Sequence, residues 1–546
     1  MSNIFLTVLF AGSIFLARWI WSSIQARRRW RQSGIPQPLG HPIFGAKGQL
    51  GPNPGRRLEE LGLTQGELFH IRFGFEDFVY VNSREAVREI FDRQSAKTSS
   101  KGPWRGATPI VSGGRIAIMP YNTHWRRLRT ILHQLLHPNV ARSFRPSQEF
   151  EATQLVSDLL QSGGEEVVCK EQAHRMSLSV ILTSTYGRRV ASMDDPICHR
   201  VDKIMEDFSQ ATAPGAFITD LIPQLDRLPT WLQWWRARAL KFHERQHSLW
   251  MGLWQELRQK VLEGSAPTCF AKHFMETETR RYEIDESQAA FLAGTLIEAG
   301  SDTSASALNI AILYLAANPA VLQQAHAEVS RVVGGDTRSP SFDDIDRLPF
   351  IHACIQEVSR IRPLTRFGTA HYTTAEVQYK QARIPAGCFV VINQPAIHHD
   401  PASYPEPHEF QPARYLKSSS WAPSSSSPSA PDIAKDKTHL NFGAGRRICP
   451  GLHVAENSLF VVLAKLVWLF DILPARDEAG RHPLPVDVSD DGFEDGANTV
   501  PKPFRVRFVP RSAARAERMR QEWEEAKRVG FVIRDVKVDL DGVVVG

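Results

Sequence analysis

One cysteine near the C-terminal end of the chain is placed where a thiolate could bind a metal ion. Cys449 lies in the loop FGAGRRICPG (residues 442–451), directly before the apolar segment Leu452–Phe470. If that segment is a helix, its first N–H groups and its positive dipole end stabilise a thiolate at Cys449. Gly445 and Gly451 carry no Cβ, so the loop backbone can approach a large flat group closely.

The neighbours of Cys449 indicate which group that is. Arg447 is a fixed cation two residues away and suits a carboxylate on the bound group. Phe442 supplies an apolar cover on the sulfur side. Thiolate, close backbone, cation and aromatic ring together describe the proximal side of a haem, so we interpret Cys449 as the axial ligand of haem b iron. The expected cofactor contacts from this loop are Phe442, Gly445, Arg447 and Gly451.

A buried structural cysteine in an ordinary loop is the alternative. It is disfavoured because five positions match at once in the pattern F-x-x-G-x-R-x-C-x-G. The segment resembles the haem-binding signature of the cytochrome P-450 monooxygenases at every fixed position. Further motifs of that family, described below, precede this loop along the chain in the family's order. The resemblance covers roughly residues 35 to 510.

The apolar segment Ala289 to Ala317 predicts a long buried helix with a polar stretch, AGSDTS, at residues 299–304. Polar residues inside a helix lower its stability unless something uses them. An acid beside a hydroxyl suits proton delivery over a cofactor, and the stretch resembles the family's oxygen-activating A-G-x-D-T segment. We therefore predict that Asp302 and Thr303 are catalytic. The alternative is that these polar residues only cap a helix and that the match to the motif is due to chance.

Two more motifs indicate contacts to the cofactor. Trp125 and Arg129 lie at i, i+4 spacing on one face of a predicted helix, and both can donate hydrogen bonds to a carboxylate. They resemble the family's propionate-binding helix, although an ordinary basic surface helix has the same pattern. His371 lies where related chains place a propionate partner. The outer side of the helix is either a solvated charged face or a docking site for an acidic electron-transfer partner; its residues are Arg126, Arg127 and His133.

A structural cluster is predicted from three charged residues. Glu357 and Arg360 form an E-x-x-R pair at i, i+3 spacing, and Arg414 ends the segment FQPAR. The FQPAR segment resembles the family's second anchor, and because E-x-x-R is common by itself, only the ordered set carries weight. One acid and two arginines predict a buried, multiply bonded ion cluster beneath the haem loop.

Composition narrows the class of protein. The chain has 546 residues, of which 42% are hydrophobic, so a large core is expected and no strong break divides it. The net charge of +6 indicates a basic face, but no nucleic-acid motif is present and no nucleic-acid partner is expected. The six cysteines are scattered without a C-x-x-C, which favours free thiols in a reducing compartment.

Residues 1–33 predict a membrane anchor with a basic flank. Ile4–Ile24 is apolar apart from Arg18 and a few small polar residues, and is long enough to span a bilayer. The flanking arginines and tryptophans place the catalytic domain on the cytosolic side; they are Arg27, Arg28, Arg29, Arg31, Trp19, Trp21 and Trp30. Together with the resemblance, this implies a single-pass protein of the endoplasmic reticulum membrane. A cleaved signal peptide is the alternative, weakened because the charges follow the apolar run. Residues 34–42 predict a stiff hinge.

We expect residues 34–510 to form the catalytic domain. The low-complexity residues 417–437 predict a disordered insertion. Residues 511–546 form a C-terminal extension with a helix and a strand, to which the sequence assigns no role. The apolar stretch 217–223 and the tryptophans that follow it either pack in the core or, as the resemblance implies, cover the substrate channel and touch the membrane.

The resemblance implies a mainly α fold with a small β portion. It also implies a haem-thiolate monooxygenase that inserts one oxygen atom from O₂ into a lipophilic small molecule. The electrons would come from a membrane-bound flavoprotein, NADPH-cytochrome P-450 reductase. The pattern looks most like fungal secondary-metabolism members. The sequence does not identify the substrate.

Two alternatives stay open. One is a haem-thiolate isomerase or dehydratase that needs neither O₂ nor a reductase, and the Asp302-Thr303 pair argues against it because such enzymes have no use for proton delivery. The other is a non-enzymatic haem-binding protein, which the apolar cavity-lining segments disfavour.

Overall fold

The computed structural model describes most of the chain. It covers Ser13, Ala17, Arg18, Trp21, Ile24, Gln25 and residues 28–545, apart from 41–45, 47, 52, 74–75, 104–106, 213–215, 222, 417–438, 478, 495–497, 534–535 and 539–543. The predicted insertion at 417–437 and most of the predicted anchor lie outside the described residues.

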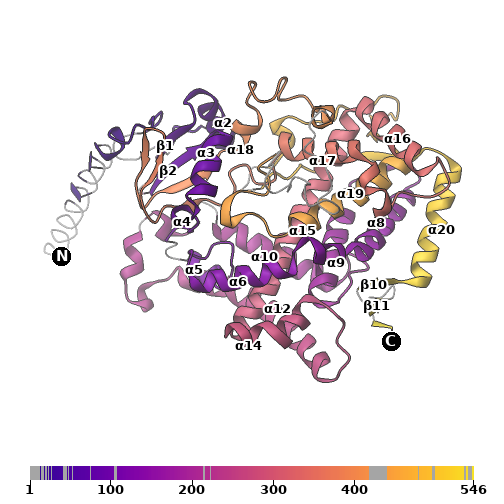
Figure 1. Ribbon diagram of the computed structural model, residues 1–546, viewed down its shortest axis with the longest axis horizontal. Helices are drawn as coiled ribbons and strands as arrows, with labels where there is room; N and C mark the ends of the chain where they lie inside the picture. Colours follow the sequence, from indigo (N-terminus) through magenta and orange to yellow (C-terminus); the bar gives the residue numbers. More distant parts are fainter. Residues whose placement is uncertain are drawn as a thin grey trace.

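Long helices form most of the molecule, and a small sheet lies at the end nearest the N-terminus (Figure 1). The mainly α fold with a small β portion is therefore confirmed. The helices are α2 (Pro54–Thr64), α3 (Arg84–Val87), α4 (Ser95–Thr98), α5 (Thr108–Val111), α6 (Thr123–Leu135), α7 (Pro138–Arg142), α8 (Arg145–Leu160), α9 (Lys170–Tyr186), α10 (Pro196–Thr212), α11 (Ile218–Leu221), α12 (Arg236–Leu262), α13 (Phe270–His273), α14 (Thr279–Tyr282), α15 (Glu286–Ala317), α16 (Pro319–Val333), α17 (Pro349–Ile361), α18 (Gln394–His398), α19 (Leu452–Leu469) and α20 (Ala513–Val529).

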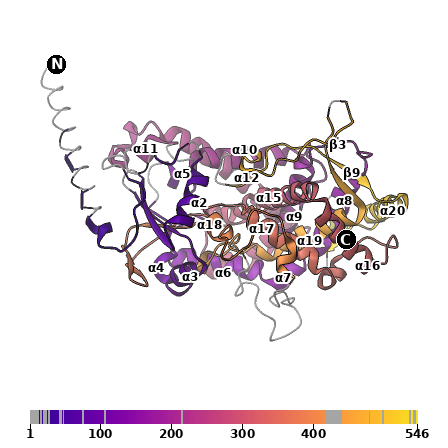
Figure 2. The same cartoon turned by 90° about the horizontal axis from the view of Figure 1, so that it is seen from above.

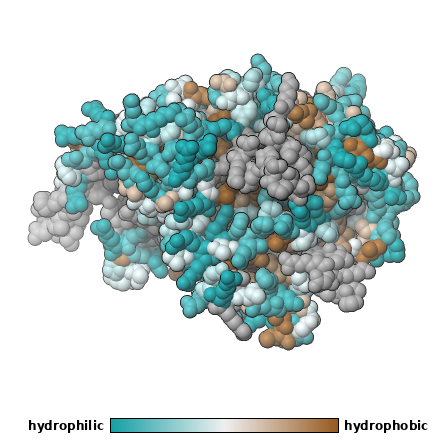
Figure 3. Space-filling model, viewed as in Figure 1, coloured by the Kyte–Doolittle hydropathy of each residue, from teal (hydrophilic) through white to brown (hydrophobic). Residues whose placement is uncertain are grey.

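The longest of these, α15, organises the core. Its first turn begins where the Asp285 carboxylate accepts the Gln288 N–H at 2.8 Å, so the helix starts one turn before the apolar run that predicts it. It ends at Asn318 because Pro319 cannot continue the same ladder of hydrogen bonds. Helices α9, α12, α17 and α19 pack around it, and its apolar residues belong to the two largest buried clusters. On the face shown in Figure 3 the surface is mostly hydrophilic, with apolar residues in small scattered groups.

The strands form four small sheets. One has the order β1-β2-β7-β4, with β1 and β2 antiparallel and β2 parallel to β7. A second has the order β3-β9-β8, a third β10-β11-β12, and β5 pairs with β6. The bounds are β1 (Leu68–Phe73), β2 (Glu76–Val81), β3 (Glu166–Val167), β4 (His371–Tyr372), β5 (Val377–Tyr379), β6 (Ala382–Ile384), β7 (Phe389–Ile392), β8 (Phe470–Pro474), β9 (Val506–Pro510), β10 (Phe531–Ile533), β11 (Val536–Val538) and β12 (Val544–Val545).

The basic flank that follows the predicted anchor packs against the domain. Trp30 is only 1% exposed and stacks on the His70 ring with centroids 3.9 Å apart, so it is part of the core and not of a membrane-facing belt. Arg29 pairs with Asp77 of β2 at 3.2 Å. The hinge is also held, because the Pro36 carbonyl accepts the His70 N–H at 2.8 Å. The sequence could not show this, because the partners lie about forty residues away.

One helix of the described residues is long and apolar enough to cross a membrane. It is α19, and 83% of its apolar window is buried inside the protein. Helices α15 and α16 meet the same criterion only as a pair that bends by 107°.

The C-terminal extension packs against the catalytic domain. Ser512 caps α20, and the Arg515 guanidinium donates to Asp336 Oδ1 at 2.6 Å and to the Trp468 carbonyl at 2.7 Å. Met519 is fully buried in the largest cluster of the core. Further along, the rings of Trp523 and Phe531 contact Phe150 of α8. Helix α20 thereby joins α8, α16 and α19, at the end of the molecule opposite the N-terminus (Figure 1).

We predict that Met519→Ala destabilises the fold, because truncating a fully buried methionine typically lowers the free energy of unfolding by about 2–5 kcal/mol. Denaturant unfolding followed by far-UV circular dichroism measures the change. The matched control is Arg520→Ala, since Arg520 pairs with Glu517 on the surface with 59% of its side chain exposed; its loss should be within about 0.5 kcal/mol of zero. Equal effects of the two changes would mean that α20 does not contribute to the core.

Candidate functional site

The loop before α19 presents a single accessible thiol. Cys449 is exposed, whereas the other five cysteines are buried. The loop is closed by the Cys449 N–H, which donates to the Phe442 carbonyl at 2.8 Å. Burial of its surroundings raises the pKa of the Cys449 thiol, while the Gly451 and Leu452 N–H groups and the Arg129 cation act in the opposite direction. A sulfur that is accessible yet surrounded by protein on most sides needs a nearby cation to stay deprotonated.

The glycines of the loop have different roles. Gly445 has a φ of +65°, and a Cβ there would lie 2.1 Å from the Phe91 carbonyl oxygen. Its N–H donates to Asp92 Oδ1 at 2.7 Å, so this glycine lets the loop lie against the end of the helical segment Arg88–Arg93. Gly451 has an ordinary φ of −84° and precedes α19. A Cβ on Gly451 would lie 3.9 Å from the Cys449 sulfur and thus beside the thiol.

Arg447 is half-buried and donates hydrogen bonds to backbone carbonyls. Its guanidinium donates to the carbonyls of Ser99, Ile116 and Met119 at 2.8, 3.1 and 2.6 Å. It also lies 4.0 Å above the centre of the Trp125 ring. Burial and the nearby Arg129 cation lower the pKa of Arg447 to about 9. The site therefore holds a cation at a considerable electrostatic cost.

The predicted pair on α6 lies beside this arginine. Arg129 donates through Nη2 to the Ile448 carbonyl, one residue before Cys449. Burial lowers the pKa of Arg129, and the Cys449 sulfur raises it. The Trp125 indole N–H donates to the Ile116 carbonyl at 3.2 Å. Trp125 thus supports Arg447 with its ring, and its N–H already has an acceptor in the protein.

A lysine that belongs to none of the sequence motifs completes this group of cations. Lys101 is 4% exposed, and its ammonium donates to the Thr369 carbonyl at 2.7 Å. Burial and Arg447 hold the pKa of Lys101 well below its ordinary value. His371, on β4, shares a 2.8 Å hydrogen bond between Nδ1 and the Thr98 carbonyl. Burial, Lys101 and Arg447 depress the pKa of His371, so its ring is neutral unless an anion arrives.

Helix α15 presents its predicted catalytic residues on two different sides. Ala299 is exposed in the middle of this otherwise buried helix, and Thr303 is one turn further on. The Thr303 hydroxyl donates to the Ala299 carbonyl at 2.6 Å. Asp302 instead turns towards α9, where its carboxylate lies 3.3 Å from His174 Nε2. The acid and the hydroxyl are adjacent in the chain but have different neighbours.

The three residues of the predicted ion cluster lie together. Arg360 donates to both oxygens of Glu357, at 2.7 and 2.8 Å, and Arg414 Nε donates to Glu357 Oε1 at 3.1 Å. The side chains of Glu357 and Arg360 are fully buried. Arg360 also donates to the carbonyls of His398 and Pro407 at 2.9 and 2.7 Å. Because the His398 ring in turn accepts the Leu440 N–H at 2.9 Å, the cluster supports the start of the cysteine loop.

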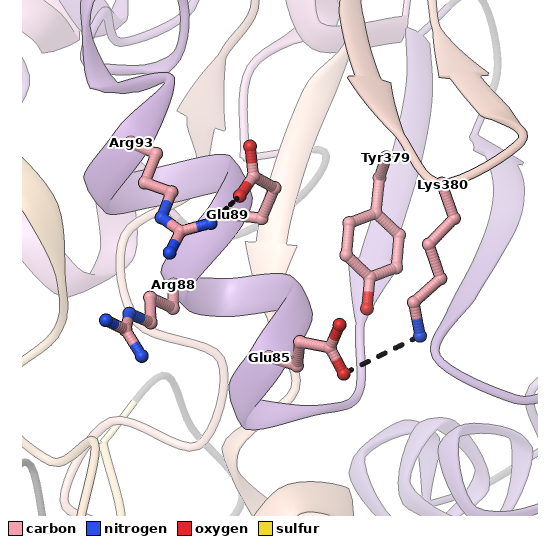
Figure 4. Close-up of a pocket in the computed structure, with 6 residues that line it drawn as sticks. All are labelled: Glu85, Arg88, Glu89, Arg93, Tyr379 and Lys380. Atoms are coloured by element: carbon pink, nitrogen blue, oxygen red, sulfur yellow. Dashed lines mark hydrogen bonds and ion pairs between the residues drawn. The ribbon is translucent and has the colours of Figure 1, made fainter.

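A surface hollow of about 390 Å³ lies between the segment 85–93 and the β5–β6 hairpin (Figure 4). Its charges largely pair with one another: Arg93 with Glu89 at 3.0 Å, and Lys380 with Glu85 at 3.6 Å. These pairs leave it without a reactive group, so we do not regard it as the functional site.

Comparison with known proteins decides between the possible interpretations of this geometry. The family model of cytochrome P450 matches residues 35–487. The chain belongs to the cytochrome P450 family. The P450 monooxygenase pgmC of Aspergillus terreus is 36% identical over 541 residues, which cover 98% of this chain and 96% of that protein. The monooxygenase verL of Clonostachys rogersoniana is 34% identical, with 91% and 90% covered, and fogE of Aspergillus ruber is 30% identical, with 90% and 91% covered. The chain is thus a haem-thiolate monooxygenase.

The residues of this P450 fit a haem. Within the described part of the chain, the hydrogen bonds of Lys101, Arg129 and Arg447 go to backbone carbonyls, and no carboxylate pairs with them. One buried and two half-buried cations without a carboxylate are unfavourable unless a ligand brings negative charge. A haem would bring two propionates to these cations, and the accessible thiol is a group that could bind its iron.

We predict that Glu357→Gln leaves Arg360 and Arg414 without their carboxylate, a loss that typically costs about 3–5 kcal/mol for a buried pair. The expected result is a lower melting temperature and protein with little haem. Thermal unfolding and the ratio of haem to protein measure both. Glu256→Gln is the control, because Glu256 pairs with Lys260 on the surface. Normal haem content and melting temperature in the Glu357 variant would contradict a structural role for the cluster.

We predict that Lys101→Met weakens haem retention without weakening the apoprotein fold. The methionine keeps the apolar stem but removes a buried cation, so the apoprotein avoids a desolvation cost while the haem loses a partner. Haem transfer to excess apomyoglobin should be faster than in the wild type. Lys97→Met, which removes a surface contact to the Glu376 carbonyl, should leave the rate unchanged. A wild-type transfer rate in the Lys101 variant would place this lysine outside the cofactor site.

Proposed function

We propose that this P450 is an NADPH- and O₂-dependent monooxygenase in which Cys449 ligates haem b. The observation that carries the proposal is the accessible Cys449 thiol beside three buried or half-buried cations that have no carboxylate partner among the described residues. Haem bound through the thiolate supplies the capacity to activate O₂ and to oxidise a C–H bond. The rest of the reaction depends on what the chain binds, orients and protonates.

The chain's own residues have separate tasks in this reaction. Arg129, Arg447 and Lys101 hold the propionates, and Gly445 and Phe442 shape the loop that presents the sulfur. His371 donates to a propionate only after it takes up a proton, since its Nδ1 faces the Thr98 carbonyl. On α15, the Thr303 hydroxyl lies at the exposed break of the helix, and Asp302 supplies protons from the α9 side.

The proposed redox partner is a flavoprotein NADPH-cytochrome P450 reductase. Exposed basic residues lie on the outer side of α6 and in the cysteine loop, which Arg129 joins through the Ile448 carbonyl; they are Arg126, Arg127, His133 and Arg446. An acidic surface on the reductase would be attracted to this group and oriented by it.

We further propose that the protein is held at the endoplasmic reticulum membrane. Besides the apolar N-terminal run, Trp231 and Trp234 are 80% and 67% exposed in the segment between α11 and α12. Helix α11 lies at the same end of the molecule as the N-terminus (Figure 2). Exposed tryptophans favour the membrane interface, so both segments can contact one lipid surface. The substrate is proposed to be a lipophilic small molecule in fungal secondary metabolism, supported by the fungal relatives.

We predict that Cys449→Ser removes the red-shifted Soret band of the reduced, carbon monoxide-bound protein, because that band requires a thiolate ligand. Cys198→Ala, which changes a buried cysteine, should keep the band. The wild type mixed with reductase should consume NADPH and O₂ together and form an oxygenated product in metabolite profiles. Product formation without NADPH would instead support a haem-thiolate isomerase.

We predict that removal of residues 1–26 releases much of the protein from membranes and leaves haem binding intact. Removal of residues 1–33 should cost haem as well, because it also deletes Trp30 and Arg29, which pack on His70 and Asp77. Membrane sedimentation and haem content measure the two effects. Loss of haem in the shorter deletion would mean that the anchor is part of the fold.

A further inference from the structure

A histidine and two aspartates from three helices meet on the side of α15 that faces α9. His174 Nε2 lies 3.3 Å from Asp302 Oδ1 on α15 and 3.4 Å from Asp202 Oδ1 on α10. The His174 side chain is 12% exposed, and those of Asp302 and Asp202 are 36% and 45% exposed. None of the sequence motifs includes His174 or Asp202. Their position makes them direct neighbours of the acid in the A-G-x-D-T segment.

The His174 ring nitrogen Nε2 lies between two carboxylates. Both separations are slightly longer than the usual 2.7–3.2 Å of an N–H···O bond, and Nε2 completes a hydrogen bond to neither carboxylate. Because an Nε2–H group can point at only one oxygen at a time, a small side-chain rotation selects Asp302 or Asp202 as its acceptor. Exchange between these two states needs no movement of the helices.

The cluster favours the protonated form of His174. The two carboxylates raise the pKa of His174 in spite of its burial, which by itself lowers it. The Lys170 cation, one turn earlier on α9, lowers the pKa of His174. His199 lies near Asp202 on α10. Burial and the neighbouring Asp302 raise the pKa of Asp202. An ordinary aspartic acid, with a pKa of about 3.9, is protonated in only about one molecule in a thousand at pH 7, whereas an imidazolium is a loaded donor there.

We propose that His174 is a positioning residue that supplies protons to Asp302, with Asp202 as the solvent-facing partner that reloads it. The inference rests on the proposed monooxygenase reaction. In that reaction NADPH gives two electrons, one oxygen atom enters the substrate, and the other leaves as water with two protons.

Each proton follows one balanced path through the cluster. It passes from His174 Nε2 to Asp302 Oδ1, which leaves a neutral imidazole and a neutral carboxylic acid. With no ion pair left to hold it, Asp302 can turn towards the Thr303 side of α15 and give up the proton. The Asp302 carboxylate then returns to His174, which takes up a proton from solvent beside Asp202.

The test uses the full-length, membrane-bound holoenzyme with reductase and no added substrate. Hydrogen peroxide released per NADPH consumed is measured from about pH 6 to about pH 9. In the wild type the ratio should rise as the pH passes the His174 midpoint, because the donor is then lost. His174→Gln should give a ratio several-fold higher and independent of pH. Thr303→Val is the reference variant, because it interrupts proton delivery after Asp302. The double variant with His174→Gln should give the same peroxide ratio as Thr303→Val alone.

His174→Arg distinguishes proton supply from simple charge pairing. Arginine keeps a cation between the two aspartates but does not release a proton near neutral pH. We expect the Arg variant to behave like the Gln variant. Recovery of the wild-type ratio by arginine would overturn the proposal, because His174 would then be only a counter-ion.

A readout independent of turnover is the titration of His174 itself. In protein labelled with ¹³C in the histidine rings, reduced and bound to carbon monoxide, the signal that His174→Gln removes identifies this residue. Its midpoint should lie above 6.5 and fall by about one pH unit in Asp202→Asn. A midpoint unaffected by Asp202→Asn would contradict the cluster. If the wild type consumed no NADPH with reductase while His174 titrated as expected, the proposed function would fail and not the cluster geometry.

Discussion

Three cations without a carboxylate partner among the described residues, one buried and two half-buried, impose the main electrostatic constraint on this fold. Lys101, Arg129 and Arg447 reach the site from a loop, a helix and the cysteine loop, and each donates to backbone carbonyls. Carbonyl dipoles only partly offset the cost of burying such charges. The depressed pKa of Arg447, about 9, reflects that remaining cost. An anionic ligand therefore stabilises the whole arrangement, and the protein carries this cost until the ligand is bound.

Contacts with the rest of the structure hold the cysteine loop in place in spite of this electrostatic cost. Gly445 permits contact with the Phe91 carbonyl, where any Cβ would collide. The ion cluster of Glu357 and Arg360 acts on the other side of the loop, through the His398 carbonyl and the hydrogen bond from Leu440. The thiol is thus positioned by contacts of short range to two parts of the fold that lie far apart in the sequence.

The sequence predicts those parts of the site that depend on short-range spacing. Cys449, Gly445 and Arg447 are identifiable because one loop carries them, and α15 because its apolar run is long. Lys101 and His174 are not identifiable from spacing, since a single lysine or histidine gives no local signal and its meaning comes from partners on other elements. Trp30 shows the same limit: a tryptophan beside arginines is typical of a membrane interface, yet the ring stacks on His70. Tertiary contacts between distant residues decide such cases.

The order of the elements along the chain has a consequence for biosynthesis. Helix α20 is made after α8, α16 and α19, yet it packs against α8 and links α16 to the end of α19 through Arg515. Until α20 has left the ribosome and docked, the surfaces of these helices that it covers remain open. A long-range contact of this kind also closes slowly, because the chain must bring together segments more than 350 residues apart. The apolar side chain of Phe150 is therefore covered late in folding, when Trp523 and Phe531 reach it.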